Sequence, residues 1–424
     1  MTRLQDDFFD YVNGEWEKTA VIPDDKPMTG GFMDLDQDIE KLMLATTDKW
    51  LAGQDVPDDP ILQNFVKYHR LVADFDGREQ AGVTPAMPLV EEYKALGSFK
   101  EFADKIAEYE MAGKPNFFTF DVAPDFMNAQ MNVLWADAPG IILPDTTYYE
   151  EGNEKGKELL TIWRKMQEEL LPKFGFSAEE TKDILDKYLE LDAKLAKYVL
   201  SNEESSEYVK LYHPYDWADF TKLAPELPLD AIFTEILGQS PDKVIVPQER
   251  FWKEFAAEYY SEENWEYLHA ALKLFSTGAW TSLLTEEIRV LSGTYVRAIS
   301  GVPEARPKEK AAYQLAQAPY NQALGLWYAE EKFSPEAKAD VEHKVKTMID
   351  VYKSRLETAD WLAKETRDKA IVKLNVITPH IGYPEKLPET YAKKVIDEQL
   401  GLIENAQNLA KVAIAHTWSK WNKE

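Results

Sequence analysis

Apolar residues recur every three or four positions in one segment after another of this 424-residue chain, the spacing of helices that bury one face. Ser177 and Glu180 form a capping box, a pair that satisfies backbone N–H groups at a helix start, ahead of an apolar stripe that reaches Leu195. Ser334 and Pro335 begin a second long helix, because Ser is a favoured N-cap and Pro a favoured first helical residue. The stripe of this second helix consists of Val341, Val345, Met348, Tyr352 and Leu356. The chain is therefore expected to be mainly α-helical.

One stretch shows the two-residue alternation of β-strands instead. Residues 116–122 and 130–135 alternate apolar with polar side chains and flank a Pro-Asp turn, which predicts a small antiparallel pair. Further helices are expected over residues 364–377 and from residue 402 onward. No internal repeat and no low-complexity linker is present, so interlocked lobes are favoured over independent domains.

The composition excludes several classes of function. Forty-eight basic and 75 acidic residues give a net charge of −27, a field that repels nucleic acid and anionic membrane surfaces. The absence of cysteine excludes disulfides, thiolate nucleophiles and Cys-ligated metals. No stretch approaches the length of apolar sequence that a membrane span needs, and no apolar signal segment follows the first residues, so a cytoplasmic location is the expectation.

The chain lacks the commonest helical zinc motif. In His-Glu-x-x-His, two imidazoles one turn apart hold the metal, and the glutamate activates the bound water. None of the six histidines is followed by Glu. A weaker pattern pairs Glu266 with His269 and Asp340 with His343, the spacing of di-metal helical bundles. Chance spacing among 75 acids explains this pattern better than a metal site does, so the di-metal bundle is a minor alternative.

Three blocks of sequence carry a resemblance to a known family. The first block contains Asp7, Phe8, Tyr11, Gly14 and Trp16, followed by Pro23, Gly31 and Phe32. The second contains Leu143, Pro144, Tyr148 and Tyr149, and the third ends at Gly382, Tyr383 and Pro384. In this order the blocks resemble the neprilysin and endothelin-converting-enzyme family of zinc metalloendopeptidases, and within it the bacterial oligoendopeptidase O kind. Asn13 stands where extracellular members carry Cys, which fits a disulfide-free bacterial member. Met28 stands where the family carries a basic residue shortly before the Gly-x-Phe.

The resemblance implies a two-lobed shell that encloses oligopeptide substrates. Residues 1–50 would form an arm of the catalytic lobe, residues 51–384 the helical substrate-enclosing lobe, and residues 385–424 the start of a truncated catalytic lobe. The family's zinc ligands follow the region that this chain covers, so no catalytic or metal residue can be assigned and no cofactor is expected in this fragment. One zinc is expected in the full-length parent, and the missing C-terminal catalytic region is the expected partner.

This interpretation predicts which aromatic residues lack partners. Large aromatics at the two ends should be more exposed than the helical-core residues Trp163 and Tyr188, because their packing partners would belong to the other lobe. The end residues are Phe8, Tyr11, Trp16, Trp418 and Trp421. A non-catalytic helical protein that binds peptides or serves as a scaffold is the alternative function.

Overall fold

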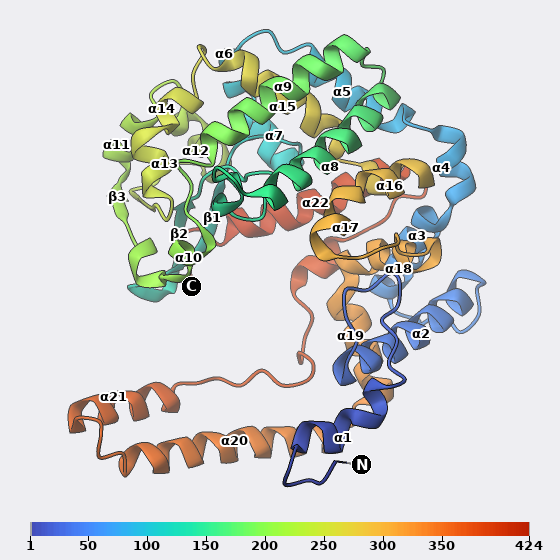
Figure 1. The fold of residues 1–424 in the computed structure, drawn as a ribbon, viewed down its shortest axis with the longest axis vertical. Helices are drawn as coiled ribbons and strands as arrows, with labels where there is room; N and C mark the ends of the chain where they lie inside the picture. Colours follow the sequence, from blue (N-terminus) through green and yellow to red (C-terminus); the bar gives the residue numbers. More distant parts are fainter. Residues whose placement is uncertain (1, 424) are drawn as a thin grey trace.

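The computed structural model describes residues 2–423 as a helical body from which a pair of helices projects (Figure 1). The mainly α-helical fold expected from the sequence is confirmed. The first helices and strands are α1 (Phe8–Glu17), α2 (Gly31–Leu51), α3 (Pro60–Ala73), α4 (Phe75–Ala81), α5 (Met87–Lys94), α6 (Phe99–Ala103), α7 (Ile106–Ala112), β1 (Phe120–Asp125) and β2 (Asn128–Ala136).

The middle of the chain adds most of the body. Its elements are α8 (Glu154–Leu170), α9 (Ala178–Leu195), α10 (Asn202–Ser206), β3 (Pro214–Asp216), α11 (Trp217–Phe220), α12 (Leu229–Leu237), β4 (Lys243–Ile245), α13 (Glu249–Glu254), α14 (Ala256–Tyr259), α15 (Trp265–Gly278), α16 (Glu286–Ser292), α17 (Thr294–Ser300) and α18 (Lys308–Gln317). The last helices are α19 (Asn321–Lys332), α20 (Pro335–Glu357), α21 (Lys364–Asn375) and α22 (Leu402–Ser419). Short 3₁₀ turns complete the list: η1 (Thr84–Ala86), η2 (Thr146–Tyr149), η3 (Leu171–Phe174), η4 (Tyr208–Leu211), η5 (Thr221–Leu223), η6 (Thr281–Leu283), η7 (Ala318–Tyr320) and η8 (Glu389–Lys393).

Three groups of buried apolar residues form the core of the body. The first lies around the sheet, α7 and α12–α15, and the second lies between α8, α9, α16 and α17. The third joins α2 and α3 to α18, α19 and α22. Helix α22 therefore crosses the body and contacts elements that precede it by about 300 residues, among them α3 and α7 (Figure 1).

The sheet has four short strands in the order β1-β2-β4-β3. β1 and β2 pair antiparallel, with Phe120 opposite Ala136, which confirms the predicted hairpin. β4 pairs parallel to β2 and antiparallel to β3. The two additional strands contain only three residues each, too few for an alternation pattern to be visible in the sequence.

Helices α20 and α21 form a hairpin that lies outside the body (Figure 1). Ser334 caps α20 as predicted, because its hydroxyl accepts the Ala337 N–H at 3.2 Å, and Pro335 is the first helical residue. Neither helix contains a buried residue. The apolar stripe of α20 thus forms a helix as its periodicity predicts, but most of it faces solvent.

The aromatic residues at the two ends of the chain behave differently from each other. Phe8, Tyr11 and Trp16 are exposed, as predicted. The prediction for Trp418 is wrong, because this side chain is only 5% exposed. Its ring lies near Phe118 and Phe233, with centroids 6.2 and 6.0 Å away.

The end of the chain is anchored to the sheet. The Trp418 indole N–H donates to Glu110 Oε1 at 3.3 Å, and Trp421 is half-buried against the same core. The Asn132 N–H donates to the Lys423 carbonyl and the Asn422 N–H to the Asn132 carbonyl, both at 2.9 Å. The division of the chain at residues 50 and 384 stays a prediction. Within residues 2–423, no helix is both long and apolar enough to cross a membrane.

Candidate functional site

The first sequence block lies on α1 and the start of α2. Asp7 is the N-cap of α1 and accepts the Asp10 N–H at 3.0 Å, which fixes where the helix begins. Gly14 is the one buried residue of α1, and a Cβ there would lie 2.5 Å from an oxygen of Asp10. The Trp16 indole N–H donates to Asp34 on α2 at 3.4 Å, which ties the two helices together.

Several apolar side chains of the same block are exposed. Phe32, which follows Gly31 at the start of α2, is 84% exposed, and Pro23 lies half-buried in the connection before it. Phe8 is 66% exposed. Exposed apolar side chains that gather on one surface are typical of interaction sites.

The second block is part of the core. Leu143 is buried, and its N–H donates to the Tyr149 hydroxyl at 3.0 Å. That hydroxyl donates to Asp192 of α9 at 2.5 Å, and the Ile142 N–H donates to the same carboxylate at 2.8 Å. The Pro144 carbonyl accepts the side-chain amide of Asn202 at 3.3 Å, and Tyr148 packs against the second core group. Residues 142–149 are therefore held from both sides.

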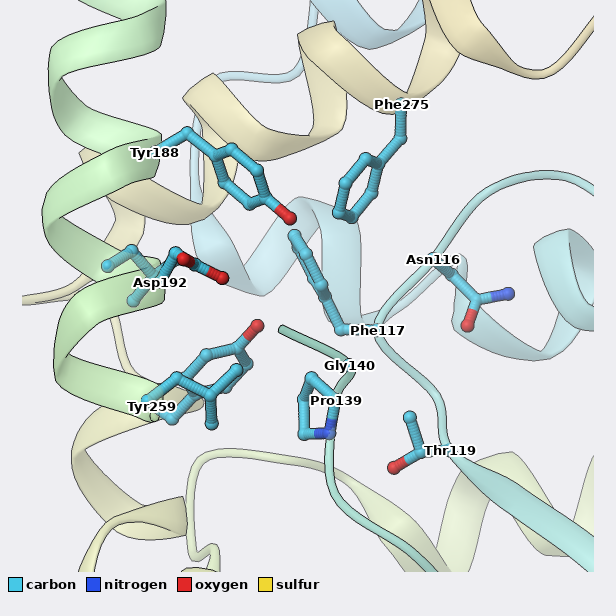
Figure 2. A pocket seen from close by; sticks show the side chains of 11 residues that line it. Asn116, Phe117, Thr119, Pro139, Gly140, Tyr188, Asp192, Tyr259 and Phe275 are labelled. Atoms are coloured by element: carbon cyan, nitrogen blue, oxygen red, sulfur yellow. The ribbon is translucent and has the colours of Figure 1, made fainter. Parts of the chain in front are cut away.

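Asp192 also borders a small enclosed cavity of about 90 Å³ (Figure 2). The hydroxyls of Tyr188 and Tyr259 point toward the centre of this cavity, and Phe275 closes one side of it. Burial raises the pKa of Asp192 to about 6, although the hydrogen bonds from Tyr149 and Ile142 favour the charged form. Burial raises the pKa of Tyr188 too, and the neighbouring Asp192 charge adds to this effect.

The cavity lies within the core and is too small to accommodate a peptide. A volume of about 90 Å³ holds a few water molecules. The carboxylate is already bound by two donors from residues 142–149. We therefore assign Asp192 and its tyrosines a structural role.

The third block closes the base of the α20–α21 hairpin. Gly382 has a φ of +72°, a backbone conformation that favours glycine, and a Cβ there would lie 2.6 Å from the Phe333 ring. The Tyr383 ring meets Phe333 edge-on at 6.2 Å, and the Lys338 ammonium lies 4.5 Å from the Tyr383 ring centroid. Pro384 follows at an exposed position.

The three blocks lie on different parts of the molecule, and they do not assemble one active site within residues 2–423. Sequence reasoning named Leu143 and Tyr149 but missed Asp192, which joins them to α9. A signal was present, because Asp192 follows Tyr188 by four positions and so falls on the apolar face of its helix.

The imidazoles and acids of the described residues do not fit a metal centre. No group of three or more metal-ligating side chains comes together within residues 2–423. The di-metal alternative is wrong, because α15 and α20 lie at opposite ends of the molecule (Figure 1). Glu266 pairs with Lys187 at 3.3 Å, and His269 hydrogen bonds to the Tyr93 carbonyl at 2.8 Å.

Comparisons with known proteins identify similar metallopeptidases. The family model described as peptidase family M13, in its N-terminal part, matches residues 4–384. A Streptococcus gordonii protein named for a zinc metalloproteinase in the scaA 5′ region is 65% identical over 423 residues, covering all of this chain and 75% of the relative. A neutral endopeptidase of Lactococcus lactis is 36% identical over 427 residues, covering all of this chain and 67% of the relative.

A solved structure shares the fold. The crystal structure of PepO from Lactobacillus rhamnosus superposes with a TM-score of 0.91 at 25% sequence identity, covering 99% of this chain and 66% of that one. The resemblance expected from the three sequence blocks is thereby confirmed. The chain belongs to peptidase family M13, whose N-terminal region it represents.

Proposed function

We propose that this chain is the substrate-enclosing portion of a zinc endopeptidase that cleaves oligopeptides, and that the zinc ligands come from a catalytic region outside these 424 residues. The observation that carries the proposal is the contrast between two parts of the molecule. The body has three buried cores, whereas α1, the first half of α2, α20 and α21 expose their apolar side chains. Such a surface is the expected attachment site of a catalytic region.

The shape of the molecule supports a role as a cover. The hairpin and α1 extend away from the body on one side (Figure 1). A second lobe attached along the hairpin would leave an interior that unfolded oligopeptides can enter and folded proteins cannot. Size selection of the substrate follows from this arrangement.

Fusion to a catalytic region tests the proposal. The chain alone and a fusion with the part of the Streptococcus gordonii relative that it does not cover are compared on a quenched fluorescent peptide. We expect no cleavage by the chain alone, and cleavage by the fusion that a chelator abolishes and zinc restores. The same peptide sequence inside a folded domain should resist the fusion.

Two results would decide against the proposal. Chelator-sensitive cleavage by the chain alone would place the zinc site within these residues. Peptide affinity in titration calorimetry, combined with an inactive fusion, would instead favour the peptide-binding scaffold. A fusion in which the glutamate of the His-Glu-x-x-His motif expected of the family is replaced by Gln controls for contaminating proteases, because it should bind peptide without cleaving it.

A further inference from the structure

A pocket of about 500 Å³ lies beside α16 and α17, where the segment that follows Pro23 meets the loop before α18. Arg289 of α16, Arg297 of α17 and Arg306 of the loop before α18 all line it. The chain has a net charge of −27. Three arginine side chains around one pocket therefore form a local positive region on a negatively charged protein. The pocket also contains the carboxylates of Asp25 and Glu304.

Two of the three guanidinium groups have no carboxylate partner among residues 2–423. Arg289 forms a two-point ion pair with Glu286, at 2.6 and 2.7 Å. Arg297 donates only to the Val290 carbonyl, at 2.9 Å, and to the Thr294 hydroxyl, at 3.2 Å. Arg306 donates only to the Gln314 side chain, at 2.5 Å. Since a guanidinium carries about five N–H donors, most donors of Arg297 and Arg306 remain available.

The Arg297 side chain lies against the junction of α16 and α17. Gly293 joins α16 to α17, and a Cβ there would lie 2.7 Å from Nη1 of Arg297, so the guanidinium rests against the helix junction. Burial and the nearby Arg289 charge lower the pKa of Arg297. Asp25 pairs with Lys310 at 3.3 Å, which leaves Glu304 as the one lining carboxylate without an ion pair in the described part of the chain.

We propose that this pocket binds a soluble phosphate monoester through Arg297 and Arg306. A phosphate monoester carries a charge of about −1.5 to −2 and three acceptor oxygens, which suits two forked, unpaired guanidinium groups. Val296, Val302 and Ala305 also line the pocket and offer an apolar wall for the ester's organic part. The site is separate from the proposed peptidase function and needs no zinc.

Titration calorimetry of the full chain with inorganic phosphate and with glycerol 3-phosphate tests the proposal. We expect saturable binding at one site, and at least tenfold weaker binding for Arg306→Ala and for Arg297→Ala. Glu304→Gln should tighten binding several-fold, because it removes the carboxylate that competes with the anion. Acetate should compete poorly, because it brings one charge and two oxygens.

Matched variants make the result decisive. Arg70 is an exposed arginine on α3, so Arg70→Ala changes the net charge equally and should leave phosphate affinity unchanged. Arg306→Lys keeps the charge but loses the fork, and is expected to bind at an intermediate level. Circular dichroism shows whether each variant is folded. Absence of saturable phosphate binding, or unchanged affinity in folded Arg306→Ala, would overturn the proposal.

Discussion

Asp192 binds two donors from residues 142–149, and so joins α9 to a turn that is about 50 positions away in sequence. Its side chain is almost fully enclosed, and no basic side chain forms an ion pair with it in the described residues. An acid in this setting is easier to protonate in the folded state than in the unfolded chain.

The pH dependence of stability follows from this shift. The folded-state pKa of about 6 lies above the ordinary value of 3.8, so the stabilising contribution of protonated Asp192 is lost as pH rises from about 4 through 6. Because the side-chain amide of the Asp192→Asn variant does not titrate, the stability of this variant relative to the natural chain should rise by about 2 kcal/mol between pH 4 and 7. Melting temperatures measured across this range provide the check.

Asp186→Asn on the same helix is the control for this prediction. Hydrogen bonds from Lys182 and Arg164 lower the pKa of Asp186, so its stabilising contribution is present at neutral pH and lost in acid. The relative stability of this variant should therefore move in the opposite direction. If the stability difference between Asp192→Asn and the natural chain does not change with pH, Asp192 is ionised as easily in the folded as in the unfolded state.

At the scale of elements, the sequence predicts where helices begin better than it predicts what they pack against. The capping box at Ser177 and Glu180 and the cap at Ser334 are both present, because capping depends on residues within one turn. Burial depends on neighbours far away in sequence. The apolar stripe of α20 and that of α22 look alike in the sequence, but only α22 lies in the core.

Trp418→Ala tests whether α22 is an integral part of the body. Removing a buried tryptophan leaves a cavity between α22, α7 and α12, and should cost about 3–5 kcal/mol of stability. Trp361→Ala is the matched control, because Trp361 lies in the α20–α21 turn and is 78% exposed. This replacement should change the stability little. Equal losses from the two variants, measured by chemical denaturation, would contradict the packing of α22.

Gly382→Ala should loosen the base of the α20–α21 hairpin. The new methyl group would require a strained backbone at φ of +72° and would collide with Phe333, at a combined cost of about 1–3 kcal/mol. Hydrogen exchange of residues 376–388 should accelerate, while exchange of the body stays unchanged. Gly325→Ala inside α19, where a Cβ meets nothing within 4 Å, is expected to slow exchange instead.

At the scale of the whole molecule, the exposed apolar surface should promote self-association. Each large apolar side chain buried between two copies contributes about 1.5–3 kcal/mol. Replacing Phe8, Phe32 and Trp361 by Ser should therefore reduce the concentration-dependent rise of the sedimentation coefficient. Replacement of Phe126 and Met127 by Ser is the control, because both side chains are exposed at the tip of the β1–β2 hairpin. This control should reduce the rise of the sedimentation coefficient less. If both sets of variants sediment alike, the surface formed by α1, the first half of α2 and the α20–α21 hairpin has no special affinity for a second copy.

The packing of distant helices against one another could not be predicted from residue patterns alone. Helical periodicity and turn signals specify single elements, whereas the third core joins α2 and α3 to α18 and α22, and no local pattern records this pairing. The resemblance to a known family supplied the family membership instead. The three arginines of the α16–α17 pocket escaped notice for the same reason, since they are spread over 18 positions without a motif.

The contact between α3 and residues 396–409 affects how the protein folds while it is synthesised on the ribosome. The Ile396 N–H donates to the Asn64 side chain at 2.8 Å, across 332 positions of sequence, and Leu409 completes the core around Phe65. The segment containing α3 therefore emerges long before its last packing partner is translated. During that interval Phe65 and its neighbours remain uncovered, so a nascent chain of this protein is expected to need a chaperone until α22 has left the exit tunnel.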